Sequence, residues 1–104
     1  MNAEKTELKE SEAKARVRIV VRGLVQGVFF RWNARLRAQQ LGVFGFVRNL
    51  ADGESVEVVA EGEKPRLRAF LEWCKRGPDG AEVRDARVEW SDCKNEFSDF
   101  QIRY

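Results

Sequence analysis

The chain has 104 residues, of which 43% are hydrophobic and 11% aromatic, so we expect one domain with a packed core rather than a disordered chain. Nineteen Lys and Arg face 17 Asp and Glu, a net charge of +2 that is too close to neutrality to favour nucleic acid or a membrane surface as a partner. No apolar run approaches the ~18 residues of a membrane span, and the first residues do not form a signal peptide, so we expect a cytoplasmic protein.

Residues 1–15 are charged, lack aromatic side chains and show no wide apolar face. This composition predicts a flexible tail, followed by a single domain over residues 16–104. The domain begins with a strand over residues 16–23, in which Val17, Ile19 and Val21 alternate with arginines and so predict one buried and one exposed face.

The arginines of this first strand permit an RNA-binding sheet, but a second interpretation is favoured. Glu57 and Glu61 follow the same alternation on a later strand, where they can pair with the arginines across the sheet. The strand also lacks the surface aromatics on which unpaired bases stack. We therefore expect cross-strand ion pairs and no nucleic-acid partner.

The remaining elements follow from hydrophobic periodicity and from turn residues. They are a loop over 24–30, a helix over 31–41 ended by Gly42, strands over 43–50 and 56–62 joined by an Asp-Gly hairpin, a helix over 64–76 ended by Gly77, a strand over 83–91 and a short strand over 100–104. In the last strand Phe100, Ile102 and Tyr104 alternate, which favours core or edge packing over a role in ligand binding.

This β-α-β-β-α-β order, with one short extra strand, is typical of the ferredoxin-like split βαβ sandwich, an α+β fold. Two helices should cover one face of an antiparallel sheet. The fold hosts many activities, so the function has to be argued from particular residues.

Histidine is absent, which removes the Ser-His-Asp and Cys-His routes and the usual general base at neutral pH. The two cysteines, Cys74 and Cys93, match no zinc-binding spacing and are expected to be reduced thiols, with Cys74 in the core. Any chemistry here must therefore run without an imidazole.

The loop between the first strand and the first helix is a candidate anion site. The first N–H groups of a helix have no internal acceptor, and the helix dipole favours a negative charge there. Arg31 could add a guanidinium fork on two phosphate oxygens, although it could also be a solvated residue of the first turn. The predicted phosphate cradle is the backbone of Gln26, Gly27, Val28, Phe29 and Phe30.

Asn49 is the second candidate, because it ends the second strand close to the hairpin. Its amide can accept a hydrogen bond from a water and donate one to an oxyanion. From this segment alone, a turn residue that bonds its own backbone is the favoured interpretation.

Taken together, these segments resemble the acylphosphatase family. The resemblance rests on the run GLVQGVFFR at 23–31, the run GFVRN at 45–49 and the ending FQIRY at 100–104, and it covers residues 16–104. It implies hydrolysis of the carboxyl–phosphate bond of small acyl phosphates, with inorganic phosphate as a product, by a monomer that needs no metal or cofactor. It also implies that Arg31 is catalytic, that Asn49 positions the water and that the backbone of 26–30 binds the phosphate.

The hairpin departs from the family pattern, since the run GESV at 53–56 is one residue longer than is common there. Its turn type, or a bulge, is left open by the sequence. A phosphate oxygen of the substrate is the expected proton acceptor, with Asp52 or Glu54 as weaker alternatives. A non-catalytic anion-binding module on the same fold is the main rival function. A domain of a larger carbamoyl-handling protein is disfavoured by the short chain.

Overall fold

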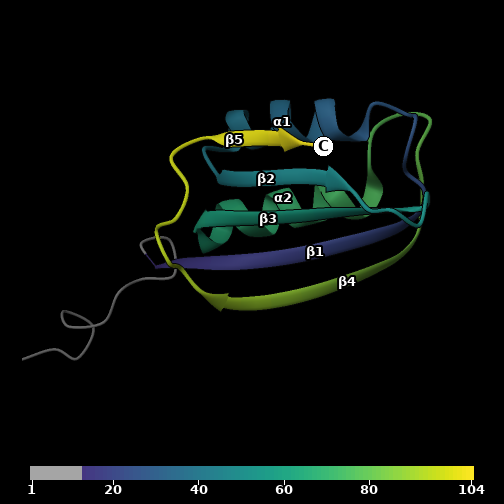
Figure 1. The fold of residues 1–104 in the computed structure, drawn as a ribbon. Coiled ribbons are helices and arrows are strands. Elements are labelled where there is room, and N and C mark those ends of the chain that lie inside the picture. Colours follow the sequence, from purple (N-terminus) through teal and green to yellow (C-terminus); the bar gives the residue numbers. More distant parts are fainter. Residues whose placement is uncertain (1–12) are drawn as a thin grey trace, which may run out of the picture.

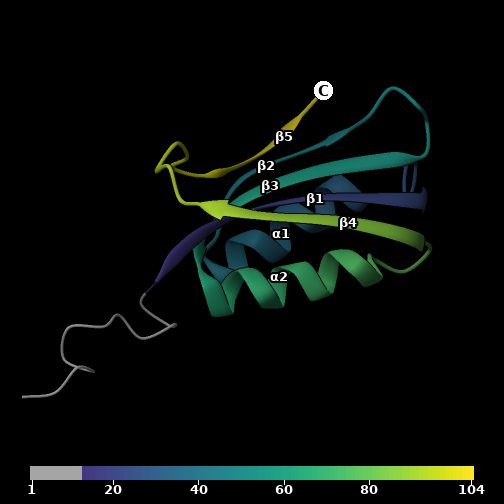
Figure 2. The same ribbon diagram turned by 90° about the horizontal axis from the view of Figure 1, so that it is seen from below.

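The computed structural model describes residues 13–104, in which seven elements follow one another in the order β-α-β-β-α-β-β. They are β1 (Lys14–Leu24), α1 (Phe30–Leu41), β2 (Phe44–Asn49), β3 (Ser55–Glu63), α2 (Lys64–Arg76), β4 (Glu82–Asp92) and β5 (Phe100–Arg103). The strands form one sheet in the order β4-β1-β3-β2-β5, and both helices lie on the same face of it (Figure 1, Figure 2). The predicted ferredoxin-like sandwich is confirmed.

The sheet is mixed, so the prediction of a wholly antiparallel sheet is wrong at one edge. β5 pairs in parallel with β2, with Gly45 opposite Phe100 and Val47 opposite Ile102, whereas β1, β3, β2 and β4 form antiparallel pairs. The reason is topological. β4 finishes at the end of the sheet where β2 starts (Figure 1). The connection over 93–99 runs from that end to the opposite edge of the sheet, so β5 starts beside the start of β2 and runs in the same direction.

The element boundaries lie within two residues of the predicted ones. The largest difference is at β1, which begins at Lys14 rather than at Arg16 and pairs there with Glu63 of β3. The N–H of Lys64 also donates to the Ala13 carbonyl over 3.0 Å. The predicted tail therefore overlaps β1 by two residues and also includes the described Ala13, whereas residues 1–12 lie outside the described residues.

The core lies between the sheet and the two helices. The inward residues of β1 and β3 are fully buried, as the alternation predicted, and the helices bury the faces that their periodicity indicated. The helical contribution comprises Phe30, Ala34 and Ala38 of α1, and Leu67, Phe70, Leu71, Trp73 and Cys74 of α2. Both cysteines are free, and burial raises the pKa of the Cys74 thiol. Within residues 13–104, no helix is long and apolar enough to span a membrane.

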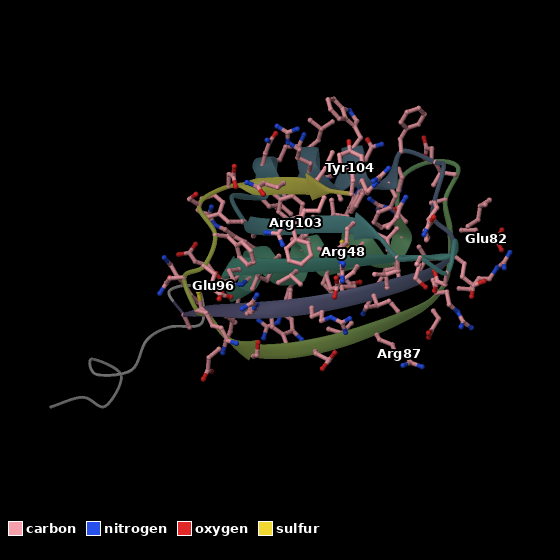
Figure 3. All side chains as sticks on the ribbon, viewed as in Figure 1. Arg48, Glu82, Arg87, Glu96, Arg103 and Tyr104 are labelled. Carbon is pink, nitrogen blue, oxygen red and sulfur yellow. The ribbon has the colours of Figure 1, made fainter. Side chains whose placement is uncertain are left out.

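The open face of the sheet carries the predicted ion pairs. Glu57, only 8% exposed, accepts hydrogen bonds from Arg18 over 2.7 Å and from Arg48 over 2.6 Å. Burial by itself would raise the pKa of Glu57, but the bonds from Arg48 and Arg18 outweigh it and hold the pKa below its ordinary value. Arg48 lies over the middle of this face in Figure 3.

The second predicted acidic partner, Glu61, is used differently. Its carboxylate accepts the backbone N–H groups of Lys94 over 2.7 Å and of Glu96 over 3.0 Å, so it fixes the connection between β4 and β5. Arg16 pairs with Glu96 instead of with Glu61. The prediction of a direct Arg–Glu61 pair is therefore not what the structure shows.

β2 places Phe44 and Phe46 on the open face, where Phe44 is 45% exposed but the ring of Phe46 is covered. The Arg103 guanidinium lies 4.0 Å from the centroid of the Phe46 ring, and the ring of Phe97 packs against it at 6.0 Å between centroids. Bases could stack on this ring only if these contacts broke.

Candidate active site

The loop that follows β1 is shaped by two residues with positive φ. Gly27 has φ 76°, which a glycine adopts without strain, and Phe29, the residue that caps α1, has φ 60° and ψ 29°. The hydrogen-bond ladder of α1 begins with the N–H of Asn33, which donates to the Phe29 carbonyl over 3.1 Å. The N–H groups that precede it at the helix start have no intrahelical acceptor, as the predicted cradle requires.

The start of α1 is strongly electropositive. Its first turn contains no acidic residue, and no side chain caps it. Arg31 stands in this turn and forms no ion pair within residues 13–104; its guanidinium carbon lies 4.7 Å from the centroid of the Tyr104 ring. A cation at the positive end of a helix dipole is unfavourable, and a bound anion removes that conflict.

Asn49 is the last residue of β2 and is paired with Val56 of β3. Its Oδ1 atom is buried and has no hydrogen-bond partner within residues 13–104. The interpretation favoured from the segment alone, a turn residue that bonds its own backbone, is therefore wrong for the amide oxygen. A buried amide oxygen without a partner is costly, and a bound water or ligand would satisfy it.

The hairpin after Asn49 is closed by Asp52 rather than by the asparagine. The Asp52 carboxylate accepts the N–H of Glu54 over 2.9 Å, the N–H of Ser55 over 2.8 Å and the Ser55 hydroxyl over 2.6 Å. The N–H of Leu50 donates to the Ser55 carbonyl over 2.9 Å. The longer hairpin is thus a well-bonded loop.

No bulge interrupts the pairing that leads into this hairpin. β2 and β3 stay in register up to Asn49 and Val56, and the register shift found in the sheet lies between β1 and β4, at Arg22 and Gly23. The extra residue is accommodated beyond the ladder, so Asn49 keeps its place at the end of β2.

Neither carboxylate of the hairpin is placed to act as a general base. The Ser55 hydroxyl is the main cause that lowers the pKa of Asp52, and Glu54 lies 3.5 Å from Arg22. Neither side chain lines the cavity that contains Arg31 and Asn49. The alternatives predicted for proton acceptance are not supported by this geometry.

Gln26 connects the loop to the hairpin. Its Nε2 atom donates to the Leu50 carbonyl over 2.9 Å and to the Ser55 carbonyl over 2.8 Å. The predicted role of Gln26 was confined to its backbone, so this side-chain bridge was missed. It fixes the loop relative to the strand end that carries Asn49.

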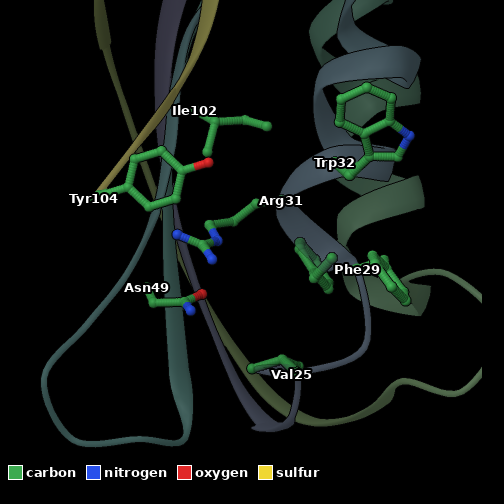
Figure 4. Close-up of a pocket in the computed structure, with 9 residues that line it drawn as sticks. Val25, Phe29, Arg31, Trp32, Asn49, Ile102 and Tyr104 are labelled. Carbon is green, nitrogen blue, oxygen red and sulfur yellow. The ribbon is translucent and has the colours of Figure 1, made fainter.

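Arg31 and Asn49 open onto one cavity of about 490 Å³ between the loop, the end of β2 and the C-terminal residues. Figure 4 shows the Arg31 side chain pointing from the start of α1 toward the side on which Asn49 and Tyr104 lie. Of the predicted cradle, Gly27, Phe29 and Phe30 line the cavity, whereas Gln26 and Val28 do not. The structure thus brings the two predicted side chains together with part of the cradle.

The sequence interpretation missed four lining residues, Val25, Trp32, Ile102 and Tyr104. Tyr104 follows the last residue of β5 and is 96% exposed, so the prediction that it packs in the core or at the sheet edge is wrong. Phe100 does enter the core, and Ile102 packs partly against it. Alternation described the strand correctly but could not show that the strand ends before its last aromatic residue.

Comparison with known proteins agrees with this geometry. A model of the acylphosphatase family matches residues 17–102. A curated relative named acylphosphatase from Aeropyrum pernix is 53% identical over 93 residues, 89% of this chain and 92% of that one. Another, from Pyrobaculum aerophilum, is 48% identical over 88 residues, 85% of this chain and 93% of that one.

A solved structure of acylphosphatase from Bacillus subtilis superimposes with a TM-score of 0.82 at 37% identity, covering 86% of this chain and 99% of that one. The family match and the names of these relatives confirm the predicted enzyme class, a hydrolase of acyl phosphates. On the strength of the match over residues 17–102, the chain belongs to the acylphosphatase family.

Proposed function

We propose that this acylphosphatase hydrolyses small acyl phosphates without a metal, with Arg31 and the backbone N–H groups of Gln26–Phe30 binding the phosphate and Asn49 positioning the attacking water. The observation that carries this proposal is the buried, unpartnered Oδ1 of Asn49 in the cavity that also contains the Arg31 guanidinium. An acceptor and a free cation in one cavity match what a water and a phosphoryl group need.

The chemistry asks little of the protein beyond position and charge. A carboxylate is a good leaving group, so its departure needs no strong acid. Phosphoryl transfer is accelerated mainly by placing the nucleophile in line and by stabilising charge on the equatorial oxygens. The electropositive start of α1 and Arg31 stabilise the charge on the equatorial oxygens, and Asn49 places the nucleophile in line.

The proton of the attacking water needs an acceptor. The chain has no His, an amide does not take up a proton near neutral pH, and neither Asp52 nor Glu54 lines the cavity. We therefore propose that a phosphate oxygen of the substrate accepts it. The protein would act as a monomer in the cytoplasm, with neither a membrane nor a nucleic acid as partner.

The test measures steady-state hydrolysis of benzoyl phosphate by its loss of ultraviolet absorbance, with EDTA present. We expect Arg31→Ala and Asn49→Ala each to lose at least ~10²–10³ in kcat, the effect typical of one oxyanion donor. Arg35→Ala is the matched control, because Arg35 is an exposed arginine one turn further along α1.

Calorimetry with inorganic phosphate separates the two roles. Arg31→Ala should weaken phosphate binding, whereas Asn49→Ala should bind phosphate and fail to turn over. Turnover close to that of the wild type in either variant refutes the assignment. A folded wild type that binds phosphate but hydrolyses no acyl phosphate would instead favour the rival anion-binding module.

A further inference from the structure

We infer that the cavity selects acyl phosphates with an aromatic acyl group, and that Phe29 and Trp32 make the selection; this inference rests on the function proposed above. The first observation is where the exposed aromatic side chains lie. Within residues 13–104, the three most exposed large hydrophobic side chains are Tyr104 at 96%, Phe29 at 78% and Trp32 at 53%, and all three line this one cavity. Clustered exposed apolar surface of this kind marks a binding site.

The charges of the cavity point to a neutral acyl group. Among residues 13–104, Arg31 is the only charged residue that lines the cavity, and Asn49 is the only amide. Once the phosphate engages Arg31, no second cation within the lining is left for an acyl group that carries its own carboxylate or phosphate. The lining therefore favours substrates whose acyl group is neutral.

The size of the cavity points to a group larger than acetyl. Its volume of about 490 Å³ falls within the range of roughly 300–1,000 Å³ that holds organic ligands of some size. Aromatic walls favour offset or edge-on packing with another ring. An arene next to the phosphate would fill this space and cover both exposed rings.

The backbone of Phe29 supports the same conclusion. At φ 60° and ψ 29° the residue is left-handed, a conformation that costs a bulky side chain energy and that glycine adopts freely. Packing does not recover that cost, because the side chain is 78% exposed. A strained, unpacked ring on the rim of an active-site cavity indicates a contact that forms only when the ligand is bound.

Trp32 completes the aromatic wall from the helix. It follows Arg31 in the first turn of α1, and its side chain lies on the α1 side of the cavity in Figure 4. The buried face of α1 is formed by Phe30, Ala34 and Ala38, so Trp32 is not needed for the core. Its indole is free to contact the acyl group of a substrate whose phosphate is on Arg31.

The experiment compares kcat/KM for benzoyl phosphate and acetyl phosphate in the wild type, Phe29→Gly, Trp32→Ala and the double variant. We expect the benzoyl-to-acetyl ratio to fall by about tenfold in the double variant, equivalent to about 1.4 kcal/mol. Using the ratio removes the intrinsic difference in leaving ability between benzoate and acetate. Phe29→Gly should also melt no lower than the wild type, because glycine relieves the left-handed backbone.

Trp90→Ala is the matched control, since Trp90 is a 43% exposed tryptophan on β4 that does not line the cavity, and it should leave the ratio unchanged. An unchanged ratio in the double variant overturns the inference, whether kcat/KM for the two substrates stays the same or falls equally for both. Either outcome leaves acyl phosphate hydrolysis by the wild type intact. A folded wild type that hydrolyses neither substrate refutes the proposed function itself.

Discussion

The side chain of Gln26 offers a direct test of how the two halves of the site are held together. It donates from one amide nitrogen to the Leu50 carbonyl over 2.9 Å and to the Ser55 carbonyl over 2.8 Å. These bonds join the loop after β1 to the hairpin that follows Asn49. Gln26→Ala removes both bonds and leaves the backbone of the loop in place.

The loss of stability can be worked from these contacts. Each hydrogen bond contributes about 0.5–1.5 kcal/mol, so removing two gives about 1–3 kcal/mol. Both carbonyls keep a second contact, since the Leu50 N–H still donates to the Ser55 carbonyl and the Gly53 N–H lies 3.5 Å from the Leu50 carbonyl. We therefore expect the lower part of the range, about 1–2 kcal/mol, which lowers the Tm of a domain of this size by about 5–15 °C.

The loss of activity follows from the position of Asn49 relative to the cradle. A misplacement of about 1 Å can cost about 10²-fold in rate, so we expect kcat on benzoyl phosphate to fall by about 10–10²-fold at a temperature at which the variant is folded. In the proposed function, inorganic phosphate binds to the loop and to Arg31, so its affinity should stay near the wild-type value. Thermal melts, calorimetry and steady-state kinetics on the same preparations measure all three quantities.

The control is Gln39→Ala, which removes an exposed glutamine from α1 and should change neither stability nor kcat. A Gln26→Ala protein that melts lower but keeps the wild-type kcat would show that the bridge is structural only. An equal loss of phosphate affinity and kcat would show that the Gln26 side chain maintains the shape of the cradle, and does not only set the distance between the cradle and Asn49. Either result refutes the reasoning.

Three further outcomes are expected. Glu57→Gln should lower the free energy of unfolding by about 1 kcal/mol at pH 7, because the two arginines bonded to Glu57 stay largely solvated. The pKa of Glu57 is lower in the folded state than in the unfolded state, so the stability that its ionised carboxylate contributes is fully present above the ordinary pKa and is lost as pH falls through the folded-state pKa. In urea melts, the difference in the free energy of unfolding between wild type and variant should therefore shrink from about pH 4.3 downward. A difference that stays constant with pH would contradict this. Tyr104→Ala should lower kcat/KM for acetyl phosphate by about 2–5-fold through loss of the contact with Arg31, and Tyr104→Phe should restore it; equal values for the two variants would assign the effect to the hydroxyl. Gly45→Ala should fail to give a cooperative thermal transition, because its Cβ would lie 1.8 Å from the backbone oxygen of Val59 at φ 155°, and a normal melt would show that β2 can shift away from β3.

Most of the fold could be predicted because its signals are local. Alternation located β1, and the Pro65 turn and Gly77 bounded α2 at the residues where the structure has them. The parallel pairing of β5 could not be predicted in this way. Strand direction at an edge depends on how the chain crosses the sheet, and the alternation of Phe100 and Ile102 is the same in either direction.

The site residues that could be predicted from the sequence are those that belong to contiguous sequence motifs. Arg31 and Asn49 each stand in such a motif, and the structure places both on one cavity. The bond network of Gln26 and Asp52 was missed because it joins residues through side chains whose direction a sequence pattern does not give. From its segment alone Asn49 was expected to close the turn, and only the structure shows that Asp52 takes that role and leaves the asparagine amide oxygen unpartnered.

At Phe29 the residue that backbone conformation favours differs from the residue that the chain contains. The loop turns there with a positive φ, and a glycine would adopt that conformation without strain. A sequence chosen for stability alone would therefore carry glycine at this position, as it does at Gly27 and at Gly42. The chain carries an exposed phenyl ring instead. A residue that breaks the local rule without recovering the cost in the free protein is best explained by a contact made on binding, and we infer that the acyl group of the substrate makes it.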